Sequence, residues 1–359
     1  MNQTATEYRI IPVDSTAFHF SPGNWTGDDG RGGSLYRQTW NPGAYFRVHW
    51  TSSSSNPSAS LLLDTSGYDN GYAPPLLTLN LDGVWTANVP CAEEINIPDL
   101  AGPGEHILTV YFAASEQRDR WGSAGNSGKN VVRVTGLKVD EDAEPGIATF
   151  GTKWMLVIGD SITEGSMADN GNHDNLSAYS YFVGQAFQAQ GFEYGISACG
   201  WSGWLHPGDD PPGDVPAYYN VSGSFDGKDG VYDDATSRWN KIDGNNHSLL
   251  DAQGRLSAYG EAGQEPAIIT INYGTNDILH GSDLVDLQAS VTQGLAALRG
   301  AAPEAHIFVI IPFGQFALPQ LKAGVLAYRE AHPHDQKITI IDLGKSIARS
   351  LGADGYWSG

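Results

Sequence analysis

Three short stretches carry the polar groups with which this chain could do chemistry. In "GDSITEG" a serine, Ser161, directly follows a run of apolar, strand-forming residues. "SACGWSG" and "YGTND" follow two further runs of that kind, and they supply glycines and the amide of Asn276. A hydroxyl, bare backbone N–H groups and a side-chain amide are what acyl transfer needs, namely a nucleophile and donors to an oxyanion. Serine in this place is also a common helix cap, so two interpretations of Ser161 stand at this point.

The elements that would position these groups lie in the second part of the chain. Five nearly continuous apolar runs are typical of strands buried on both faces; they cover residues 154–159, 193–199, 267–274, 306–312 and 338–344. Apolar residues at helical spacing lie between them, over residues 178–191, 283–300 and 317–332. This alternation predicts a doubly wound α/β sheet of about five parallel strands, with its site at their carboxyl ends.

The first part of the chain has a different pattern. Eight short β-rich runs alternate with clusters of Gly, Pro, Asn, Ser and Asp; they cover residues 7–14, 35–40, 44–50, 59–65, 75–83, 84–90, 105–114 and 131–140. Such spacing is typical of an all-β sandwich or jelly roll. The charged stretch "DEDAEPG", residues 140–146, indicates a linker. We therefore expect a β-sandwich domain over residues 1–145 and an α/β domain over residues 146–359.

One connection in the α/β part is unusually long. The 66 residues 200–265 carry no regular pattern, and connections of that kind are uncommon unless they are functional. Since this connection starts at the carboxyl end of a strand, we expect it to lie over the site.

Composition and charge exclude several classes of partner. With 41 Asp and Glu against 20 Lys and Arg, the chain should repel nucleic acid and anionic membranes. No run of about 18 apolar residues predicts a membrane span. The start "MNQTATEYRI" has no signal-peptide pattern, which predicts a cytoplasmic protein, or a secreted one where Met1 is not the natural start.

The chain has two cysteines, Cys91 and Cys199. Neither lies in a Cys-x-x-Cys pattern or a Cys/His cluster, so we expect two unpaired thiols and predict no metal site and no cofactor. The oligomeric state stays open.

The stretches "GDSITEG" and, about 115 residues later, "GTND" resemble the first and third sequence blocks of the SGNH (GDSL-type) hydrolases. This resemblance covers residues 150–359. It implies that Ser161 is the nucleophile and also gives a backbone N–H to the oxyanion hole, while Asn276 gives a side-chain N–H. A glycine after the second strand supplies the third donor, either Gly200, which we prefer, or Gly203. Asp160 and Asp277, next to these residues, are then expected to brace the loops.

The first part of the chain resembles the N-terminal jelly roll of carbohydrate esterases such as family two, which opens in a way similar to "HFSPGNW" at residues 19–25. The resemblance implies a serine esterase, similar to acetylxylan esterases, that removes O-acetyl groups from polysaccharides or oligosaccharides. A sugar-binding platform would then use aromatic rings of the long connection, namely Trp201, Trp204 and Trp239 with Tyr218 and Tyr219. The alternatives are a lipid or aryl-ester hydrolase on the same scaffold, or an impaired relative that only binds carbohydrate.

The catalytic base is the part of the pattern that this sequence departs from. In the SGNH family a histidine follows the last strand in an Asp-x-x-His pattern. Here "KSIARSLGADGYWSG" follows that strand without a histidine, and Asp354 has Trp357 at the family's spacing. Either the chain stops just before its catalytic Asp and His, or Trp357 replaces the base. In both cases we expect the 359-residue chain to be a weak esterase, unless His206 or His280 serves instead.

Overall fold

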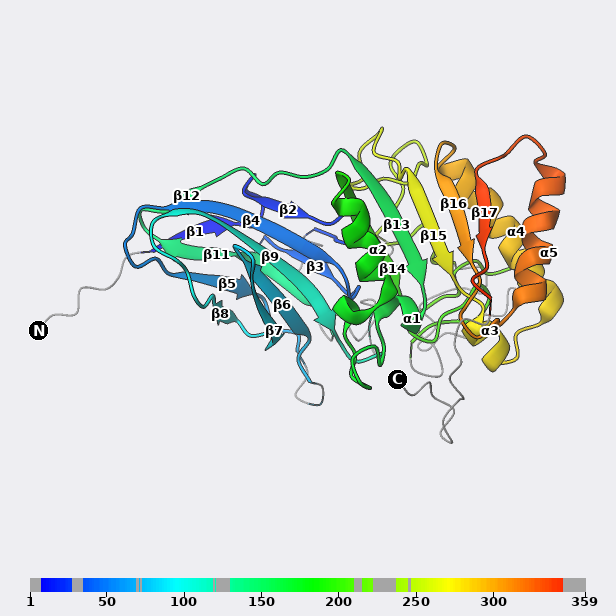
Figure 1. Cartoon of the computed structure of the whole chain (residues 1–359), viewed down its shortest axis with the longest axis horizontal. Coiled ribbons are helices and arrows are strands. Elements are labelled where there is room, and N and C mark those ends of the chain that lie inside the picture. The colour runs from blue at the N-terminus through cyan, green and yellow to red at the C-terminus, as the bar shows by residue number, and fades with distance from the viewer. Residues whose placement is uncertain are drawn as a thin grey trace, which may run out of the picture.

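The computed structural model describes residues 8–27, 35–68, 71, 73–118, 120, 130–209, 215–221, 237–244 and 247–344. Two antiparallel sheets lie on one side and a parallel sheet with its helices on the other (Figure 1). Antiparallel pairing ends at Pro145 and parallel pairing begins at Lys153. The predicted fold class, a parallel α/β sheet preceded by an all-β part, is confirmed.

The antiparallel part consists of two sheets that share one core. The first has the order β1 (Tyr8–Pro12), β11 (Val132–Asp140), β5 (Ala59–Leu63) and β8 (Glu94–Asn96), and β3 (Arg37–Thr39) pairs with β11. The second has the order β12 (Glu144–Pro145), β4 (Tyr45–Ser52), β9 (Gly104–Ala114), β6 (Leu76–Leu81) and β7 (Val84–Pro90), and β2 (Phe18–Phe20) pairs with β4.

Alternating side chains of both sheets meet in this core, for example Leu61 and Leu137 of the first sheet and Val48 and Val110 of the second. The period of two along each strand puts every second residue on the inner face. The architecture is therefore a β-sandwich, and the narrower expectation of a jelly roll stays a prediction.

The parallel sheet has five strands, in the order β14 (Phe192–Ala198), β13 (Lys153–Gly159), β15 (Ile268–Asn272), β16 (His306–Ile310) and β17 (Ile338–Ile341). All four pairs are parallel. Both faces are covered, because Leu156 and Ile158 of β13 lie in one core and Met155 and Val157 in another. This double burial explains the continuous apolar runs of the sequence.

Long helices cover the two faces of this sheet. On one face α4 (Leu284–Ala301) and α5 (Leu318–Ala331) pack together over β15 and β16. On the other, α2 (Tyr179–Gln188) follows the short helix η1 (Asn175–Ser177) and packs on β14. Two short helices, α1 (Ser161–Glu164) and α3 (Thr275–Leu279), begin directly beyond the carboxyl ends of β13 and β15. All three helices and all five strands predicted in this part are present.

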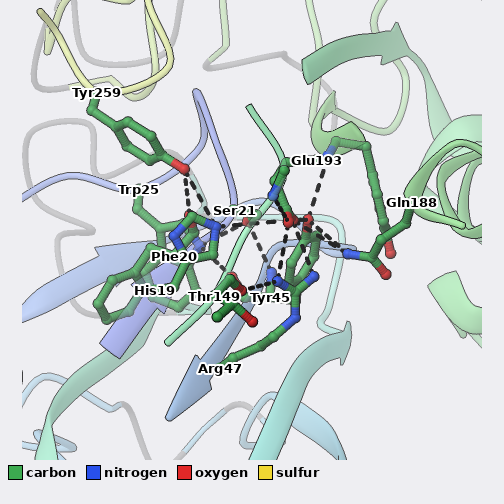
Figure 2. Close-up of polar contacts among 12 residues, drawn as sticks. His19, Phe20, Ser21, Trp25, Tyr45, Arg47, Thr149, Gln188, Glu193 and Tyr259 are labelled. Carbon is green, nitrogen blue, oxygen red and sulfur yellow. Dashed lines mark hydrogen bonds and ion pairs between the residues drawn. The ribbon is translucent and has the colours of Figure 1, made fainter. Parts of the chain in front are cut away.

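A buried ionic network joins the sandwich to the parallel sheet where β14 begins (Figure 2). Glu193 of β14 accepts hydrogen bonds from Arg47 of β4 at 3.0 and 3.1 Å, from the Tyr45 hydroxyl and from Gln188. Burial alone would raise the pKa of Glu193, but Arg47 and the other donors lower it. Burial lowers the pKa of the neighbouring His19 to about 4. Since both partners of the Arg47–Glu193 pair are largely buried, the two parts are held in a fixed relation here.

Two expectations from the sequence need correction. The stretch 140–146 is not a free linker, because Glu144 and Pro145 form β12 on the edge of a sandwich sheet, where proline is tolerated. The long connection after β14 does not simply lie over the site. Its residues Leu249 and Leu256 are buried in the main core, and Tyr259 bonds to the sandwich at the Phe20 carbonyl. An irregular segment with scattered apolar residues can fill a core without showing a helical or strand period.

Candidate active site

The first group of the site lies where β13 turns into α1. Asp160 caps the helix, since its Oδ1 accepts the Ile162 N–H at 3.0 Å. A Cβ atom on Gly159 would lie 1.9 Å from Thr163 Oγ1, so only glycine permits this tight turn. Ser161 is the first helical residue and is half-buried. Its backbone N–H lies in the first turn, where no helical acceptor is available.

The strand register brings the other two groups to this position. Gly159 lies beside Ala198 of β14 and beside Asn272 of β15. Neighbouring strands are about 4.8 Å apart, so the three strands end side by side. Gly200 follows Ala198 by two residues, and Asn276 follows Asn272 by four. The structure therefore brings the three predicted loops together at one edge of the sheet.

Backbone hydrogen bonding distinguishes Gly200 from Gly203. The Gly203 N–H donates to the His206 carbonyl at 2.9 Å, so it is already occupied. Among the described residues, no acceptor bonds to the Gly200 N–H. The next residue, Trp201, has a positive φ of 66°, a strained conformation that clusters at functional sites. This geometry supports Gly200 as the free donor.

Asn276 lies in the first turn of α3 and is 6 % exposed. Its Nδ2 donates to the Ser202 carbonyl at 2.9 Å and, at 3.5 Å, to Asp160 Oδ2. The amide is therefore held between the loop after β14 and the residue that precedes Ser161. Its first hydrogen bond has an ordinary length, and its second is at the upper limit of hydrogen-bond distances.

Two buried aspartates brace the loops, as expected. The Asp277 carboxylate accepts the backbone N–H groups of Trp204, Leu205 and His206 at 3.0, 2.8 and 3.1 Å. Burial raises the pKa of Asp277, although these three donors act against it. Burial also raises the pKa of Asp160, to about 7. The loop after β14 thus takes its shape from a residue of α3.

Cys199 is a rival nucleophile by its position one residue before Gly200. Its side chain is fully buried, and burial raises the pKa of its thiol to about 12. A thiol attacks as the thiolate, so this cysteine is inert near neutral pH. Cys91 is likewise buried, in the sandwich core, and both cysteines are free. Ser161 is therefore a stronger nucleophile candidate than Cys199.

The comparisons with known proteins agree with this geometry. Residues 157–336 match the sequence pattern of the GDSL-like lipase/acylhydrolase family. The chain belongs to the GDSL-like lipase/acylhydrolase family. This family shows it to be an ester hydrolase, and the matched region begins inside β13 and includes all three loops of the site.

Several solved structures share the fold over nearly the whole chain. One is a family two carbohydrate esterase from Clostridium thermocellum in complex with cellohexaose, at 13 % identity and a TM-score of 0.62, covering 95 % of this chain and 91 % of that one. A second is the acetyl xylan esterase Est2A of the rumen bacterium Butyrivibrio proteoclasticus, at 16 % identity and a TM-score of 0.61, covering 93 % and 88 %. A third is the salicylyl-acyltransferase SsfX3 of a tetracycline biosynthetic pathway, at 14 % identity and a TM-score of 0.55, covering 93 % and 85 %. No curated protein matches the chain by sequence.

The aromatic platform predicted for this GDSL-like hydrolase needs correction. Trp204 and Tyr218 are fully buried and pack with Tyr273, so they cannot stack on a sugar. Both belong to the main core, and Asp277 accepts the backbone N–H of Trp204. Trp239 and Tyr219 pack against the same core and are partly buried. Trp201 is half-buried, and its ring lies 5.4 Å from that of His280.

Two histidines lie together at the rim of the site. The rings of His206 and His280 stack with centroids 4.4 Å apart, and His206 Nδ1 lies 2.9 Å from the Trp201 carbonyl. Burial lowers the pKa of both. Among the described residues, no histidine is hydrogen-bonded to Ser161. The C-terminal prediction, which concerns Asp354 and Trp357, falls outside the described residues.

Arg238 of the long connection is a residue that the sequence did not single out. Its buried guanidinium donates to the Gly159 carbonyl at 3.4 Å, to Ser202 Oγ at 3.3 Å and to the Tyr273 hydroxyl. It thereby touches all three loops of the site. No sequence signal marks it, since an arginine in a polar stretch usually indicates an exposed residue.

Metal ligands and membrane helices were also sought in the described ranges. No group of three or more His, Cys, Asp or Glu side chains is arranged there to hold a metal ion. No helix in those ranges is both long and apolar enough to cross a membrane.

Proposed function

We propose that this hydrolase is a serine esterase that removes O-acetyl groups from polysaccharides or oligosaccharides. The observation that carries the proposal is the side-by-side ending of β14, β13 and β15, which brings Gly200, Ser161 and Asn276 to one place. Ester hydrolysis needs a nucleophile and donors around the same carbonyl. Ser161 would serve both roles, and the other two residues would complete the donor set.

In the proposed reaction, Ser161 Oγ attacks the carbonyl carbon of the acetyl ester and gives its proton to a general base. The carbonyl π electrons move to oxygen, and this oxyanion accepts hydrogen bonds from the N–H groups of Ser161 and Gly200 and from Asn276 Nδ2. The bond between carbon and the sugar oxygen then breaks, and the sugar oxygen takes the proton. Water attacks the acetyl-serine in a second cycle and releases acetate and free Ser161.

Asn276 must reorient slightly for this role. Its 3.5 Å contact with Asp160 Oδ2 is the weaker of its two hydrogen bonds, so that hydrogen is the one that would turn toward the oxyanion. Catalytic hydrogen bonds are often long in a free enzyme and tighten when the substrate binds. A single donor of this kind typically contributes about 100- to 1000-fold in rate.

We place the sugar part of the substrate in a cavity next to the loop that follows α1. It has a volume of about 480 Å³ and lies between the end of β9 and the loop after α1. Its lining is mixed, with polar residues such as Glu116, Asp169, Asn172 and Asp174 and apolar residues such as Leu76 and Ala114. Asp174 donates its backbone N–H to Gly165, the residue that ends the helix of Ser161. The carboxylates and the amide can bond sugar hydroxyls, and the apolar side chains can contact the faces of a sugar ring, so the comparison of ester classes below has to separate sugar from lipid substrates.

The test compares ester classes and uses a Ser161→Ala control. Acetate release from acetylated xylan and acetylated manno-oligosaccharides is measured for the parent chain and for Ser161→Ala, beside the hydrolysis of long-chain 4-nitrophenyl esters. The proposal predicts serine-dependent acetate release and poor activity on long-chain esters. Preference for the long-chain esters would support the lipid alternative, and carbohydrate binding without serine-dependent release would support a binding-only relative. Transfer of the acetyl group to an added alcohol, with little acetate formed, would indicate an acyltransferase.

A further inference from the structure

A second buried ionic network joins the sandwich to the α/β part, and it lies directly behind the loops of the site. Arg120 belongs to the segment that follows β9 of the sandwich, and its side chain is fully buried. Its guanidinium bonds to Glu164, the last residue of α1, and through Nε to Asp209 Oδ1 at 3.2 Å. The Arg120 backbone N–H donates to Asp209 Oδ2 at 3.0 Å. Both carboxylates are buried as well.

Each partner of Arg120 is connected directly to a group of the proposed oxyanion hole, either through the same short helix or through one hydrogen bond. Glu164 lies in the same four-residue helix as Ser161, and its N–H donates to the carbonyl of the cap, Asp160. The backbone N–H of Asp209 donates to the Gly200 carbonyl at 2.8 Å. A shift of the guanidinium would therefore move both the Ser161 helix and the Gly200 loop.

A second residue of the sandwich segment acts on the same loops. Gln117 Nε2 donates to Glu164 Oε2 at 3.0 Å. A Cβ atom on Gly200 would lie 2.5 Å from that nitrogen, so the Gln117 amide packs directly on the Gly200 Cα. The sandwich thus contacts the oxyanion loop itself as well as its support.

We propose that Arg120 is a positioning residue for the oxyanion hole, so that the sandwich is part of the catalytic unit and not only a separate module. The inference rests on the proposed function of Ser161 and Gly200. Arg120 does not touch the substrate. It fixes the distance between the two backbone donors, and a misplacement of about 1 Å can cost about 100-fold in rate.

The chain offers a matched control at the opposite end of β14. Arg47 also reaches from the sandwich to a buried glutamate of the α/β part, at the start of that strand. Arg47→Met therefore removes the same kind of ion pair between the same two parts, away from the Ser161 and Gly200 loops. A purely structural role for Arg120 predicts the same consequences for both substitutions.

The experiment measures kcat and KM for 4-nitrophenyl acetate in the parent, Arg120→Met, Arg120→Lys and Arg47→Met. Ser161→Ala gives the background rate without the proposed nucleophile. We expect Arg120→Met to lower kcat by about 10- to 100-fold with a small change in KM. Arg120→Lys should recover part of this loss, because it keeps the charge without the planar fork. Arg47→Met should keep the parent kcat. Equal kcat losses in Arg47→Met and Arg120→Met would overturn the proposal.

Loss of one partner from a buried ion pair can unfold a protein, so a variant that leaves no unpaired buried charge in this network is needed. Arg120→Met combined with Glu164→Gln and Asp209→Asn removes all three charges together. It should keep parent-like thermal stability and still have the low kcat. A stable triple variant with the parent kcat would refute the positioning role.

Hydrogen exchange separates this proposal from the proposed function. We expect faster backbone exchange over residues 199–209 in Arg120→Met and parent-like exchange there in Arg47→Met. If the parent is no faster than Ser161→Ala on acetyl esters, the proposed function fails. The positioning role of Arg120 is then tested by the hydrogen-exchange result alone. Unchanged exchange over residues 199–209 in Arg120→Met would overturn the positioning role whatever the activity.

Discussion

Replacing Asp160 by asparagine should change how the stability of the α/β part depends on pH. Asp160 is fully buried between Ile162, whose N–H it accepts, and Asn276. Burial raises the pKa of its carboxyl from 3.8 to about 7, with a further contribution from Asp277. The folded chain therefore holds the proton more tightly than the unfolded chain does.

Because the folded chain binds this proton more tightly than the unfolded chain does, ionisation of Asp160 lowers the free energy of unfolding. The contribution of Asp160 to stability is fully present below about pH 4 and is lost as the pH rises through about 7. The difference between the two pKa values corresponds to a loss of about 4 kcal/mol, an order-of-magnitude figure. Asparagine has no charge to bury, and it caps a helix about as well as aspartate. The stability of Asp160→Asn minus that of the parent should be constant below about pH 4 and should increase by about 4 kcal/mol between there and pH 8.

Hydrogen exchange of β13, read by mass spectrometry from pH 4 to about 8.5, measures the opening free energy of this core. Comparing parent and variant at each pH removes the intrinsic pH dependence of exchange. A difference that does not vary with pH, or that falls as the pH rises, would refute the buried-carboxyl argument.

Four further substitutions test the site. Asn276→Ala should lower kcat for 4-nitrophenyl acetate by about 100-fold or more with little change in KM, and a parent-like kcat would remove Asn276 from the oxyanion hole. Gly203→Ala would place a Cβ atom 2.3 Å from Oδ2 of Asp277, and three backbone N–H groups hold that carboxylate in place. It should therefore destabilise the chain by about 1–3 kcal/mol in urea unfolding. Gly200→Ala meets only the end of the Gln117 side chain and should cost less, and the reverse order would contradict the assignment of the two glycines. His280→Ala should leave kcat nearly unchanged, because His280 stacks at the rim on His206; a large loss would identify His280 as the base.

Local patterns predicted the part of the fold that positions the site. Leu156 and Ile158 face one core of the parallel sheet and Met155 and Val157 the other, and burial on both faces makes such a strand visible as one apolar run. Ser161 and Asn276 could be found because each lies within four residues of the end of such a strand. The carboxyl ends of parallel strands lie at one edge, so the sequence order alone brings these residues near each other.

Residues that act through tertiary contacts left no such pattern. Arg120 lies in the sandwich part, more than forty residues before α1, and nothing local distinguishes it from an exposed arginine. Arg238 and Trp204 lie in an irregular connection where composition indicates exposure, yet both are fully buried. The aromatic content of that connection predicts a sugar-binding surface, but much of it fills the main core. Short elements such as β12 were missed because two residues carry no period.

The central claim is that Ser161 attacks the ester, and trapping the acyl-enzyme tests it most directly. The chain is mixed with excess 4-nitrophenyl acetate, quenched in acid within the first turnover and digested, and the acetylated peptide is identified by mass spectrometry. The account predicts one acetyl group, on Ser161, with no acetyl-enzyme and background hydrolysis in Ser161→Ala. Parent-rate hydrolysis by Ser161→Ala, or an acetyl-enzyme on another residue, would contradict it.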